Sequence, residues 1–489
     1  MAGKTEDRLP KDLIRIALVL VAGAIAPMLD TTMVNIAVNH FSRDFHASLD
    51  TVQWVITGYV LALGIAVPFS GWLIRRFEGK AVYFAAELLF MLSSLLAGFS
   101  WNIGSLIAFR IVQGFSAGII IPLLTTLLVQ AAGQHQMGRL MSIVGFPIIV
   151  GPILGPIFGG LIVEYVSWRW IFFVNVPIGI IALVLIHLKM PRFPAADRRA
   201  ALDWTGILLL GGLSASFIYG ISRGTHGDGF GNATVIGFIA LGAVLTAAYV
   251  IYALLRPASV IVPLGLFRFR SFTGSAIVLF LAGTGTNGAM LLLPLFFQNV
   301  RHDSVISAAL ALIPQGLGML VARPAVGMLT DKVGARWVVL AAAAITFAGT
   351  LPFVFFAPDV PYWLIGLVLF VRGIGVGGIT MPVMADAYTG LAGPQVPQAS
   401  VATRIVQNVG GAFGSALLAT VAANRLRQAV PDPSHAAAAY HAGFLVASVV
   451  TAALVLPALL LTRKSRAPAG QGTAESRHGA ESGSIRRGG

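Results

Sequence analysis

Several ionisable side chains lie inside long apolar stretches of this sequence, where a charge is costly. Four of them are candidates for a functional role: Asp30, Glu87, Arg110 and Asp386. A charged residue at the centre of a membrane-spanning helix costs about 2.5–3.5 kcal/mol on the insertion scale, so such residues are usually paired and functional. A carboxylate in this setting can take up and release a proton. The chemistry that these residues predict is binding and exchange of protons and cationic ligands.

Asp30 and Arg110 are expected to meet. At 1.5 Å per helical residue, Asp30 lies about 12 Å from the outer end of its apolar stretch, and Arg110 lies about 9–10 Å from the outer end of another. Because the two depths match, we predict a shared polar pocket in the N-terminal half. A proton and a cationic substrate would compete for Asp30, which yields antiport. The alternative is a purely structural ion pair.

Glu87 lies about 9–10 Å from the cytoplasmic end of its stretch at helical rise. It could be a second proton site or an anchor for a substrate cation. The alternative is that its side chain snorkels toward Lys80 or Arg76 near the same interface.

In the C-terminal half, opposite charges lie at one depth. Asp386, Arg404 and Arg323 all fall within about 6–10 Å of the cytoplasmic ends of their stretches. We expect either a network that acts as a gating latch or a set of solvated interface charges. Arg372 lies near mid-membrane and needs a partner that the sequence does not identify.

Polar side chains at other positions of these stretches are candidates to line a cavity, although simple hydrogen bonds between helices explain each of them equally well. These residues are Asn35, Tyr59, Gln113, Asn287, Gln298, Gln407 and Asn408.

The composition indicates which elements must hold these residues. Of the 489 residues 57% are hydrophobic and 11% are charged, and the mean hydropathy is +0.84, whereas soluble proteins carry about 25% charged residues. This composition predicts a polytopic membrane protein. The polar N-terminus has no cleavable signal pattern, so we expect the first apolar stretch to be kept as a transmembrane helix.

Other classes of protein find little support. There is no cysteine, which excludes disulfides and thiolate metal sites. The nine histidines show no metal-ligand spacing, and no Walker A motif is present, so we expect no cofactor and no use of ATP by that route. The proton exchange predicted for Asp30 leads us to expect a proton gradient as energy source. Gly114–Gly118 fits the G-x-S-x-G pattern but lies within a predicted membrane helix, so an enzyme is not expected. The net charge of +14 is attributed to loops that orient the chain in the bilayer, and not to nucleic-acid binding.

Fourteen apolar stretches are long enough to cross a bilayer, which takes about 20 residues. They are 14–38, 51–73, 81–100, 104–129, 138–166, 169–188, 203–222, 232–255, 271–298, 304–329, 336–356, 361–388, 399–424 and 440–462. The loops on one side carry 13 lysines and arginines and the opposite loops carry 6, so we expect both termini in the cytoplasm.

An internal repeat divides the chain. The loops 71–80 and 327–336 both begin with G-x-L, and residues 110–118 loosely resemble residues 372–378. We therefore predict a cytoplasmic N-terminus (1–13), a six-helix bundle (14–188), a linker with two inserted helices (189–260), a second six-helix bundle (261–462) and a disordered cytoplasmic tail (463–489). Two repeated bundles around a central cavity are an established transporter architecture.

The segment 150–160 reads V-G-P-I-L-G-P-I-F-G-G. Three of its glycines are four residues apart and share one helix face, where small side chains let another backbone approach. Prolines bend such a helix. We expect either a static packing surface or a seam between two halves that slide. The residues concerned are Gly151, Pro152, Gly155, Pro156, Gly159 and Gly160.

These motifs resemble those of the major facilitator superfamily. Residues 150–160 resemble its antiporter motif, and residues 28–38, 53–59, 110–114 and 168–179 resemble signatures of its fourteen-helix drug:proton antiporter branch. The resemblance implies an all-α fold of two six-helix bundles plus two inserted helices, alternating access, and export of hydrophobic, often cationic, compounds in exchange for protons. By resemblance we expect a bacterial cytoplasmic membrane.

The cytoplasmic loop motif of the family departs from its pattern in the first half, where the position of the aspartate is occupied by Arg75. The second copy keeps that aspartate as Asp331. The resemblance implies that these loops gate the cytoplasmic side, with reversed charge in the first half. The loop residues are Gly71, Arg75, Arg76, Gly327, Asp331, Gly334 and Arg336.

The sequence thus predicts a proton-coupled multidrug exporter that works as a monomer in the lipid bilayer, with drugs or metabolites as ligands and no nucleic acid. Two alternatives stay open: a dedicated exporter or importer of one metabolite, and a non-transporting membrane scaffold or sensor. Whether a periplasmic adaptor protein binds the transporter is also open.

Overall fold

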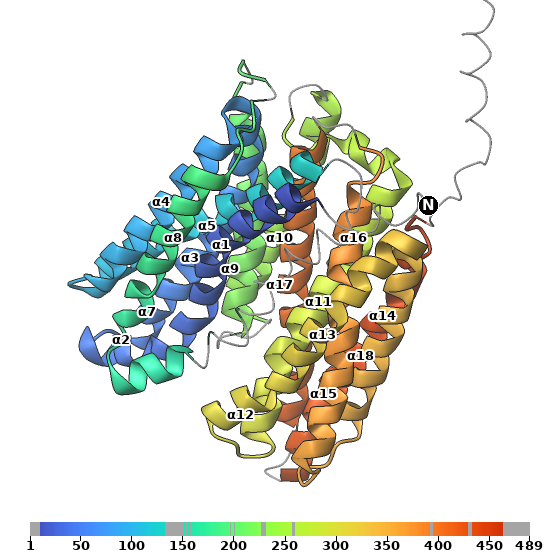
Figure 1. Cartoon of the computed structure of the whole chain (residues 1–489). Coiled ribbons are helices and arrows are strands. Elements are labelled where there is room, and N and C mark those ends of the chain that lie inside the picture. Colours follow the sequence, from blue (N-terminus) through green and yellow to red (C-terminus); the bar gives the residue numbers. More distant parts are fainter. Residues whose placement is uncertain are drawn as a thin grey trace, which may run out of the picture.

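The structure is a computed structural model, and it describes residues 10–132, 151, 155, 158–195, 197–199, 201–225, 231–256, 260–391, 395–428 and 433–462. Two groups of helices form two halves of the molecule (Figure 1). The N-terminal half contains α1 (Lys11–Met33), η1 (Val34–Ala37), α2 (Val38–Asp44), α3 (Leu49–Arg76), α4 (Gly79–Gly98), α5 (Ile103–Ala132), α7 (Trp170–Phe173) and α8 (Asn175–Lys189).

The C-terminal half begins after two further helices, α9 (Trp204–Thr225) and α10 (Ala233–Leu255). It contains η2 (Leu264–Arg268), α11 (Arg270–Asn299), α12 (Val305–Ala311), α13 (Ile313–Val333), α14 (Ala335–Thr350), η3 (Leu351–Val354), α15 (Tyr362–Gly377), α16 (Thr380–Ala387), α17 (Val396–Gln428), α18 (Pro433–Ala453) and α19 (Val455–Ala458).

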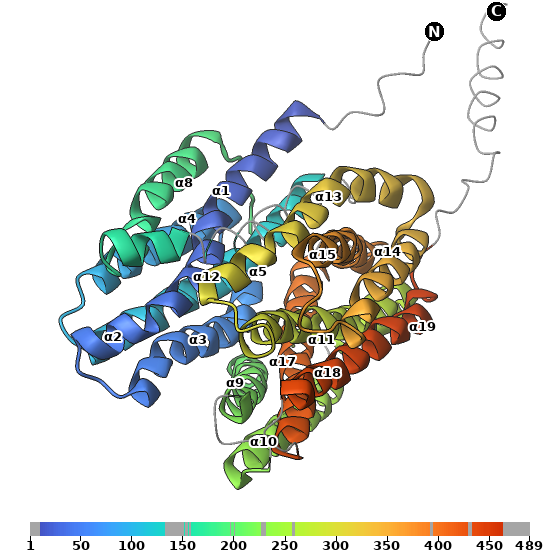
Figure 2. The ribbon, with the colours of Figure 1, turned by 90° about the horizontal axis from the view of Figure 1, so that it is seen from below.

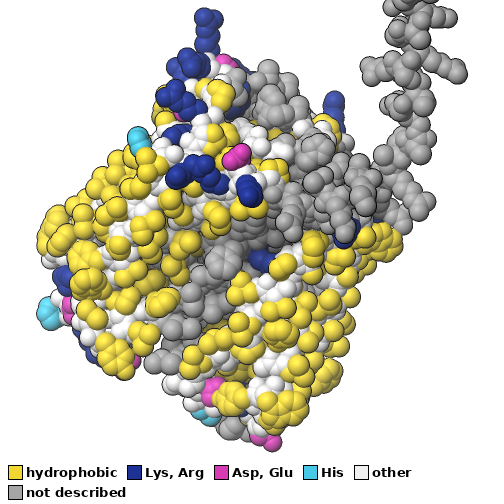
Figure 3. Space-filling view, in the orientation of Figure 1, with side chains coloured by type: hydrophobic (Ala, Val, Ile, Leu, Met, Phe, Trp, Pro, Cys, Tyr) yellow, Lys and Arg dark blue, Asp and Glu magenta, His cyan; other side chains and the backbone are white. Residues whose placement is uncertain are grey.

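Within the described residues, 11 helices are long and apolar enough to cross a membrane. Of the fourteen predicted spans, 138–166 lies largely outside the described residues. The predicted span 304–329 corresponds to α12 with α13, and the predicted span 399–424 corresponds to α17. These helices carry several charged and amide side chains and are not among the 11. Hydrophobic side chains cover the flanks of both halves, and lysines and arginines gather toward the upper end of the face in Figure 3. The chain is therefore a polytopic membrane protein.

In each half, a glycine lets two corresponding helices pack closely against each other. In the N-terminal half, Gly114 on α5 lies against the backbone of Tyr59 on α3. In the C-terminal half, Gly373 on α15 lies against the backbone of Gln315 on α13. A Cβ at either glycine would meet backbone atoms, which side-chain rotation cannot relieve. The second and fourth long helices of each half are thus joined in the same way.

The two halves meet along a seam, which we define by the contacts of α17 with α3 and α5. The hydroxyls of Thr125 on α5 and Ser400 on α17 are 3.0 Å apart, and Ser400 Oγ also donates to the carbonyl of Pro122 at 3.2 Å. A Cβ at Gly71 would lie 2.8 Å from Val401 Cγ2. These contacts lie near the ends of α3 and α5 that lead into the predicted cytoplasmic loops, and the ribbons diverge from there toward α2 and α12 (Figure 1).

The two inserted helices lie on one side of the seam. Helix α9 packs against α3 of one half and α17 of the other, and α10 packs on α9 (Figure 2). Helix α9 therefore bridges both halves, which is more than the sequence indicated for it.

The glycine face of residues 150–160 packs against α1. A Cβ at Gly151 would lie 2.7 Å from the carbonyl oxygen of Met28, Gly155 faces Thr32, and a Cβ at Gly159 would lie 3.1 Å from Met33. The nearest neighbour of these three glycines is thus a helix of their own half. A Cβ added at Gly160 would have no other atom within 4 Å. Pro152 and Pro156 lie outside the described residues.

Candidate functional site

The structure brings Asp30 and Arg110 together in the interior of the N-terminal half. The guanidinium Nη1 of Arg110 on α5 donates to Asp30 Oδ2 on α1. The exposed fraction is 0% for Asp30 and 1% for Arg110, so this is a buried ion pair. A buried pair is favourable only where further hydrogen bonds satisfy its remaining donors and acceptors.

Two neighbours, Gln113 and Asn175, supply such hydrogen bonds, and Ser94 in turn holds Asn175. Gln113 accepts from Arg110 Nη1 at 2.6 Å and donates to Asp30 Oδ1 at 3.3 Å. Asn175, the first residue of α8, donates to the same Asp30 oxygen at 3.0 Å and to Ser94 Oγ on α4 at 3.0 Å. We call these five residues the Asp30 cluster. It ties four helices of the N-terminal half to one carboxylate.

The arginine is also held from α3. Its Nε donates to the carbonyl of Val55 at 3.2 Å, and its guanidinium carbon lies 4.0 Å from the centre of the Tyr59 ring. A cation over an aromatic face is attracted by the ring quadrupole, more strongly where water is excluded. The hydroxyl of Tyr59 lies 3.4 Å from the carbonyl of Pro27. Arg110 thus keeps neutral partners whatever the charge of Asp30.

Glu87 stands apart from this cluster. It lies on α4 with 0% of its surface exposed, and neither carboxyl oxygen has a hydrogen-bond partner in the part of the chain that the structure describes. The alternative was snorkelling toward Lys80 or Arg76, but Glu87 is fully buried, and Lys80 Nζ donates to the carbonyl of His187 at 2.9 Å. Glu87 is therefore buried within the N-terminal half, where a charge would not be solvated.

Asp386 was expected to form a network with Arg404 and Arg323. Its described hydrogen bonds go to other residues. Asp386 accepts from the hydroxyl and the N–H of Thr462, the latter at 3.2 Å, and from Ser275 Oγ at 3.4 Å. Arg404 donates to Gln407 at 3.3 Å. Thr462, four residues after the end of α19, thus supplies two donors to this carboxylate.

Arg372 is the counterpart of Arg110 in the C-terminal half. Its exposed fraction is 2%. Its Nη1 donates to Gln315 at 2.6 Å, and its Nε donates to Thr350 at 3.1 Å. Both arginines are therefore held by a glutamine, but the described partners of Arg372 are neutral, whereas Arg110 has a carboxylate partner.

The predicted gate loops lie at the same end of the molecule as the seam. Arg75 pairs with Asp197 at 4.0 Å, and both side chains are partly exposed. Arg75, which stands where the resembled loop motif has an aspartate, is thus paired with an acidic residue. Arg336 donates from its Nε to the carbonyl of Leu461 at 3.0 Å. Gly334 ends α13 with a φ of 91°, a backbone conformation that favours glycine.

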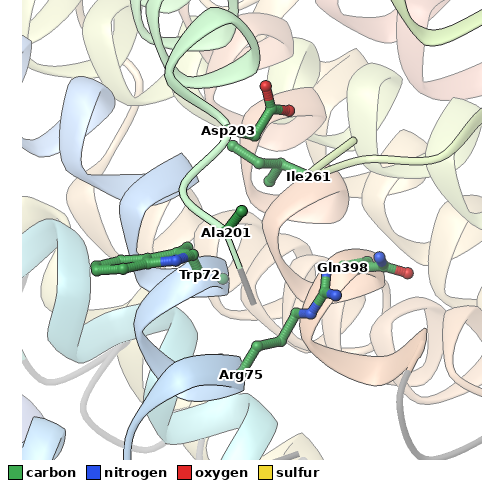
Figure 4. Close-up of a pocket in the computed structure, with 7 residues that line it drawn as sticks. Trp72, Arg75, Ala201, Asp203, Ile261 and Gln398 are labelled. Carbon is green, nitrogen blue, oxygen red and sulfur yellow. The ribbon is translucent and has the colours of Figure 1, made fainter. Parts of the chain in front are cut away.

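A pocket lies between the first gate loop and the seam. Trp72 and Arg75 reach it from α3, Gln398 from α17, and Ala201, Asp203 and Ile261 from the connections on either side of α9 and α10 (Figure 4). Gly71 completes its lining. The pocket therefore joins both halves and the inserted helices, but it is separate from the Asp30 cluster.

The remaining predicted residues have varied surroundings. Gln298 and Asn408 are partly exposed, and the side chains of Asn35 and Asn287 lie outside the described ones. Gly327 is buried in α13, and Arg76 and Asp331 each have a polar, charged or ring contact.

Two members of the Asp30 cluster were not predicted, Asn175 and Ser94. Asn175 lies within residues 168–179, whose resemblance to a family signature was noted, so a signal for it was present. Ser94 offers no comparable signal, because a serine in a membrane helix is common.

Comparison with known proteins gives a consistent picture. The family model described as "Major Facilitator Superfamily" matches residues 20–415 and 276–487. The chain is 36% identical over 424 residues to "Multidrug resistance protein B homolog" of Mycobacterium tuberculosis, covering 85% of this chain and 77% of the relative. It is 30% identical over 416 residues to "Multidrug export protein EmrB" of Haemophilus influenzae, covering 84% and 81%.

Solved structures share the fold. The human organic anion transporter MFSD10 superimposes with a TM-score of 0.60 at 15% identity, covering 93% of this chain and all of that chain. The proton:xylose symporter XylE superimposes with a TM-score of 0.59 at 16% identity, covering 91% and 96%. The family and the fold are those of membrane transporters and not of an enzyme. With a family model and a relative of this similarity covering most of its length, the chain belongs to the Major Facilitator Superfamily.

Proposed function

We propose that this protein is a proton-coupled antiporter that exports hydrophobic, often cationic, small molecules across a bacterial cytoplasmic membrane. Asp30 binds the proton, and a cationic substrate competes with that proton for the N-terminal half. Relatives whose names describe multidrug resistance and multidrug export support the substrate class. Both termini face the cytoplasm, and the energy comes from the proton gradient.

The single observation that carries the proposal is the buried Asp30–Arg110 pair. Protonation of Asp30 removes one charge of the pair, and Arg110 then keeps Gln113, the Val55 carbonyl and the Tyr59 ring. The proton therefore changes which contacts hold α1, α4, α5 and α8 together. A ligand moves a conformational equilibrium only by its different affinity for the two states, and a carboxylate that links four helices provides such a difference.

The seam supports alternating access. Its polar and close contacts involve small side chains: the Thr125–Ser400 hydroxyl contact, the bond to the Pro122 carbonyl, and the Gly71–Val401 approach. Contacts between small side chains can separate without leaving a buried charge unpaired. The described conformation is then the one closed at the end of the gate loops, and transport requires that this seam open.

The test uses inverted membrane vesicles that hold a pH gradient. A panel of hydrophobic cations, including tetraphenylphosphonium and ethidium, and of neutral hydrophobic compounds is added, and the gradient is followed with a pH-sensitive dye. We expect several compounds to dissipate the gradient in vesicles with the wild-type protein. Asp30→Asn abolishes that response, whereas Asp12→Asn, at an exposed position of the same helix, keeps it.

Other outcomes separate the alternatives. A response to one compound alone indicates a dedicated transporter. A full response of Asp30→Asn, matching that of the wild type, refutes Asp30 as the coupling site. Absence of a response to every compound, together with absence of substrate counterflow in proteoliposomes, indicates a scaffold or sensor.

A further inference from the structure

We propose that Glu87 is a second proton-binding group of the N-terminal half, separate from Asp30, and that it carries its proton in the described conformation. The role of this proton in transport rests on the proposed function. Its presence on Glu87 does not, and it is tested on its own below.

The first argument is burial without a partner. Glu87 has 0% of its surface exposed, and both carboxyl oxygens lack a hydrogen bond to any described residue. An isolated buried carboxylate is far more costly than a buried neutral acid, so such a group becomes neutral by taking up a proton. The neutral acid is the form that this site tolerates.

The second argument is the absence of a counter-charge among the groups that face Glu87 from the elements packed around α4. Tyr83, one turn away, donates its hydroxyl to the carbonyl of Leu20 on α1 at 2.6 Å. Asp30 on α1 and Arg110 on α5 are paired with each other, and the Tyr59 ring on α3 packs on that arginine. His187 on α8 has its ring against Phe84. No described cation forms an ion pair with Glu87.

The third argument is separation from the Asp30 cluster. Ser94, a member of that cluster, lies seven residues after Glu87 on the same face of α4, which is about 10 Å at 1.5 Å per residue. Phe90, fully buried, lies between them, and a phenyl ring cannot carry a proton. The two carboxyl groups therefore sit at two depths, with Glu87 nearer the end of the gate loops.

The same geometry argues against Glu87 as an anchor for a substrate cation. Helix α4 packs mainly against α5 and α8, at the side of its own half, whereas α3 and α5 form the seam. A proton can reach Glu87 through small fluctuations, but a drug-sized cation would have to part α4 from its neighbours.

Infrared spectroscopy of the purified full-length protein in liposomes tests the protonation directly. At neutral pH we expect a carbonyl stretch of a protonated carboxylic acid that disappears in Glu87→Gln. Glu87→Asp, which keeps a carboxyl group, retains a shifted band. Glu164→Gln, which removes an exposed carboxylate, leaves the band unchanged and serves as the matched control. A spectrum of Glu87→Gln that equals the wild-type spectrum overturns the proposal.

Coupling is tested with tetraphenylphosphonium in proteoliposomes with the membrane potential held at zero. Each coupled proton multiplies the final substrate gradient about tenfold per unit of pH difference, because a tenfold ratio corresponds to the same free energy in either gradient. We expect Glu87→Gln to lower the final gradient about tenfold and Glu164→Gln to leave it unchanged. An unchanged gradient in Glu87→Gln overturns the coupling role. If the wild type transports no panel compound with protons, the proposed function fails, and the infrared band still decides the protonation.

Discussion

The buried ion pair between Asp30 and Arg110 makes a quantitative prediction about stability. We consider the variants Asp30→Asn, Arg110→Gln and the double variant, each of which removes charge without removing much volume. Either single change leaves one charge with 0–1% exposure and no opposite partner. The double variant removes both charges and leaves a set of neutral amides.

The contacts set the magnitude. Removal of one partner of a buried pair costs about 3–5 kcal/mol. In Asp30→Asn the new amide oxygen can still accept one neutral hydrogen bond, worth about 0.5–1.5 kcal/mol, so we expect a net loss of about 2–4 kcal/mol. The same reasoning applies to Arg110→Gln. The double variant should lose about as much as one single variant, which gives a coupling energy of about 2–4 kcal/mol.

The assay is reversible unfolding in mixed micelles with increasing sodium dodecyl sulfate, followed by the fluorescence of the eight tryptophans. Asp12→Asn is the control, and its stability should equal that of the wild type. Independent sites add within about 0.3–0.5 kcal/mol. If the double variant loses the sum of the two single losses within that margin, the residues do not act as a pair, and the reasoning about the Asp30 cluster is refuted.

Two further predictions concern packing and the seam. Gly151→Ala places a Cβ 2.7 Å from the Met28 carbonyl oxygen, and such overpacking should lower the free energy of unfolding by about 1–3 kcal/mol. In the control Gly160→Ala, the new Cβ has no atom within 4 Å, so this variant should unfold at the same detergent concentration as the wild type. The chain has no cysteine, so Thr125→Cys with Ser400→Cys introduces one unique pair across the seam. Oxidation should cross-link it and stop transport, and reductant should restore transport; cross-linking without loss of transport would show that the seam need not open.

The sequence predicted how deep the charged residues lie along their helices, but it did not predict all of the residues that contact them. Asp30 and Arg110 were placed together because helical rise converts residue number into depth, and depth is the same for any arrangement of the helices. Asn175 and Ser94 were not predicted, because their contact with Asp30 depends on how α8 and α4 are rotated about their own axes. Periodicity within one helix does not determine that rotation.

The glycine-rich segment illustrates the same limit. Its spacing indicated a smooth face for a close neighbour, and Gly151 and Gly159 do approach backbone atoms. The identity of the neighbour was open, since both α1 and the other half are apolar and either could fill the groove. Similarly, Arg75 indicated a reversed charge in the first loop, but its partner Asp197 lies 122 residues away and no local pattern connects them.

The two halves repeat their architecture but not their chemistry. Arg110 and Arg372 lie on corresponding helices, each bonded to a glutamine, and Gly114 and Gly373 pack those helices on their neighbours in the same way. Among the described contacts, Arg110 has a carboxylate partner, whereas Arg372 has only Gln315 and Thr350. The amide and the hydroxyl do not change charge with pH. Under the proposed function, a proton on Asp30 alters the contacts of Arg110, whereas the described side-chain partners of Arg372 are neutral at every physiological pH.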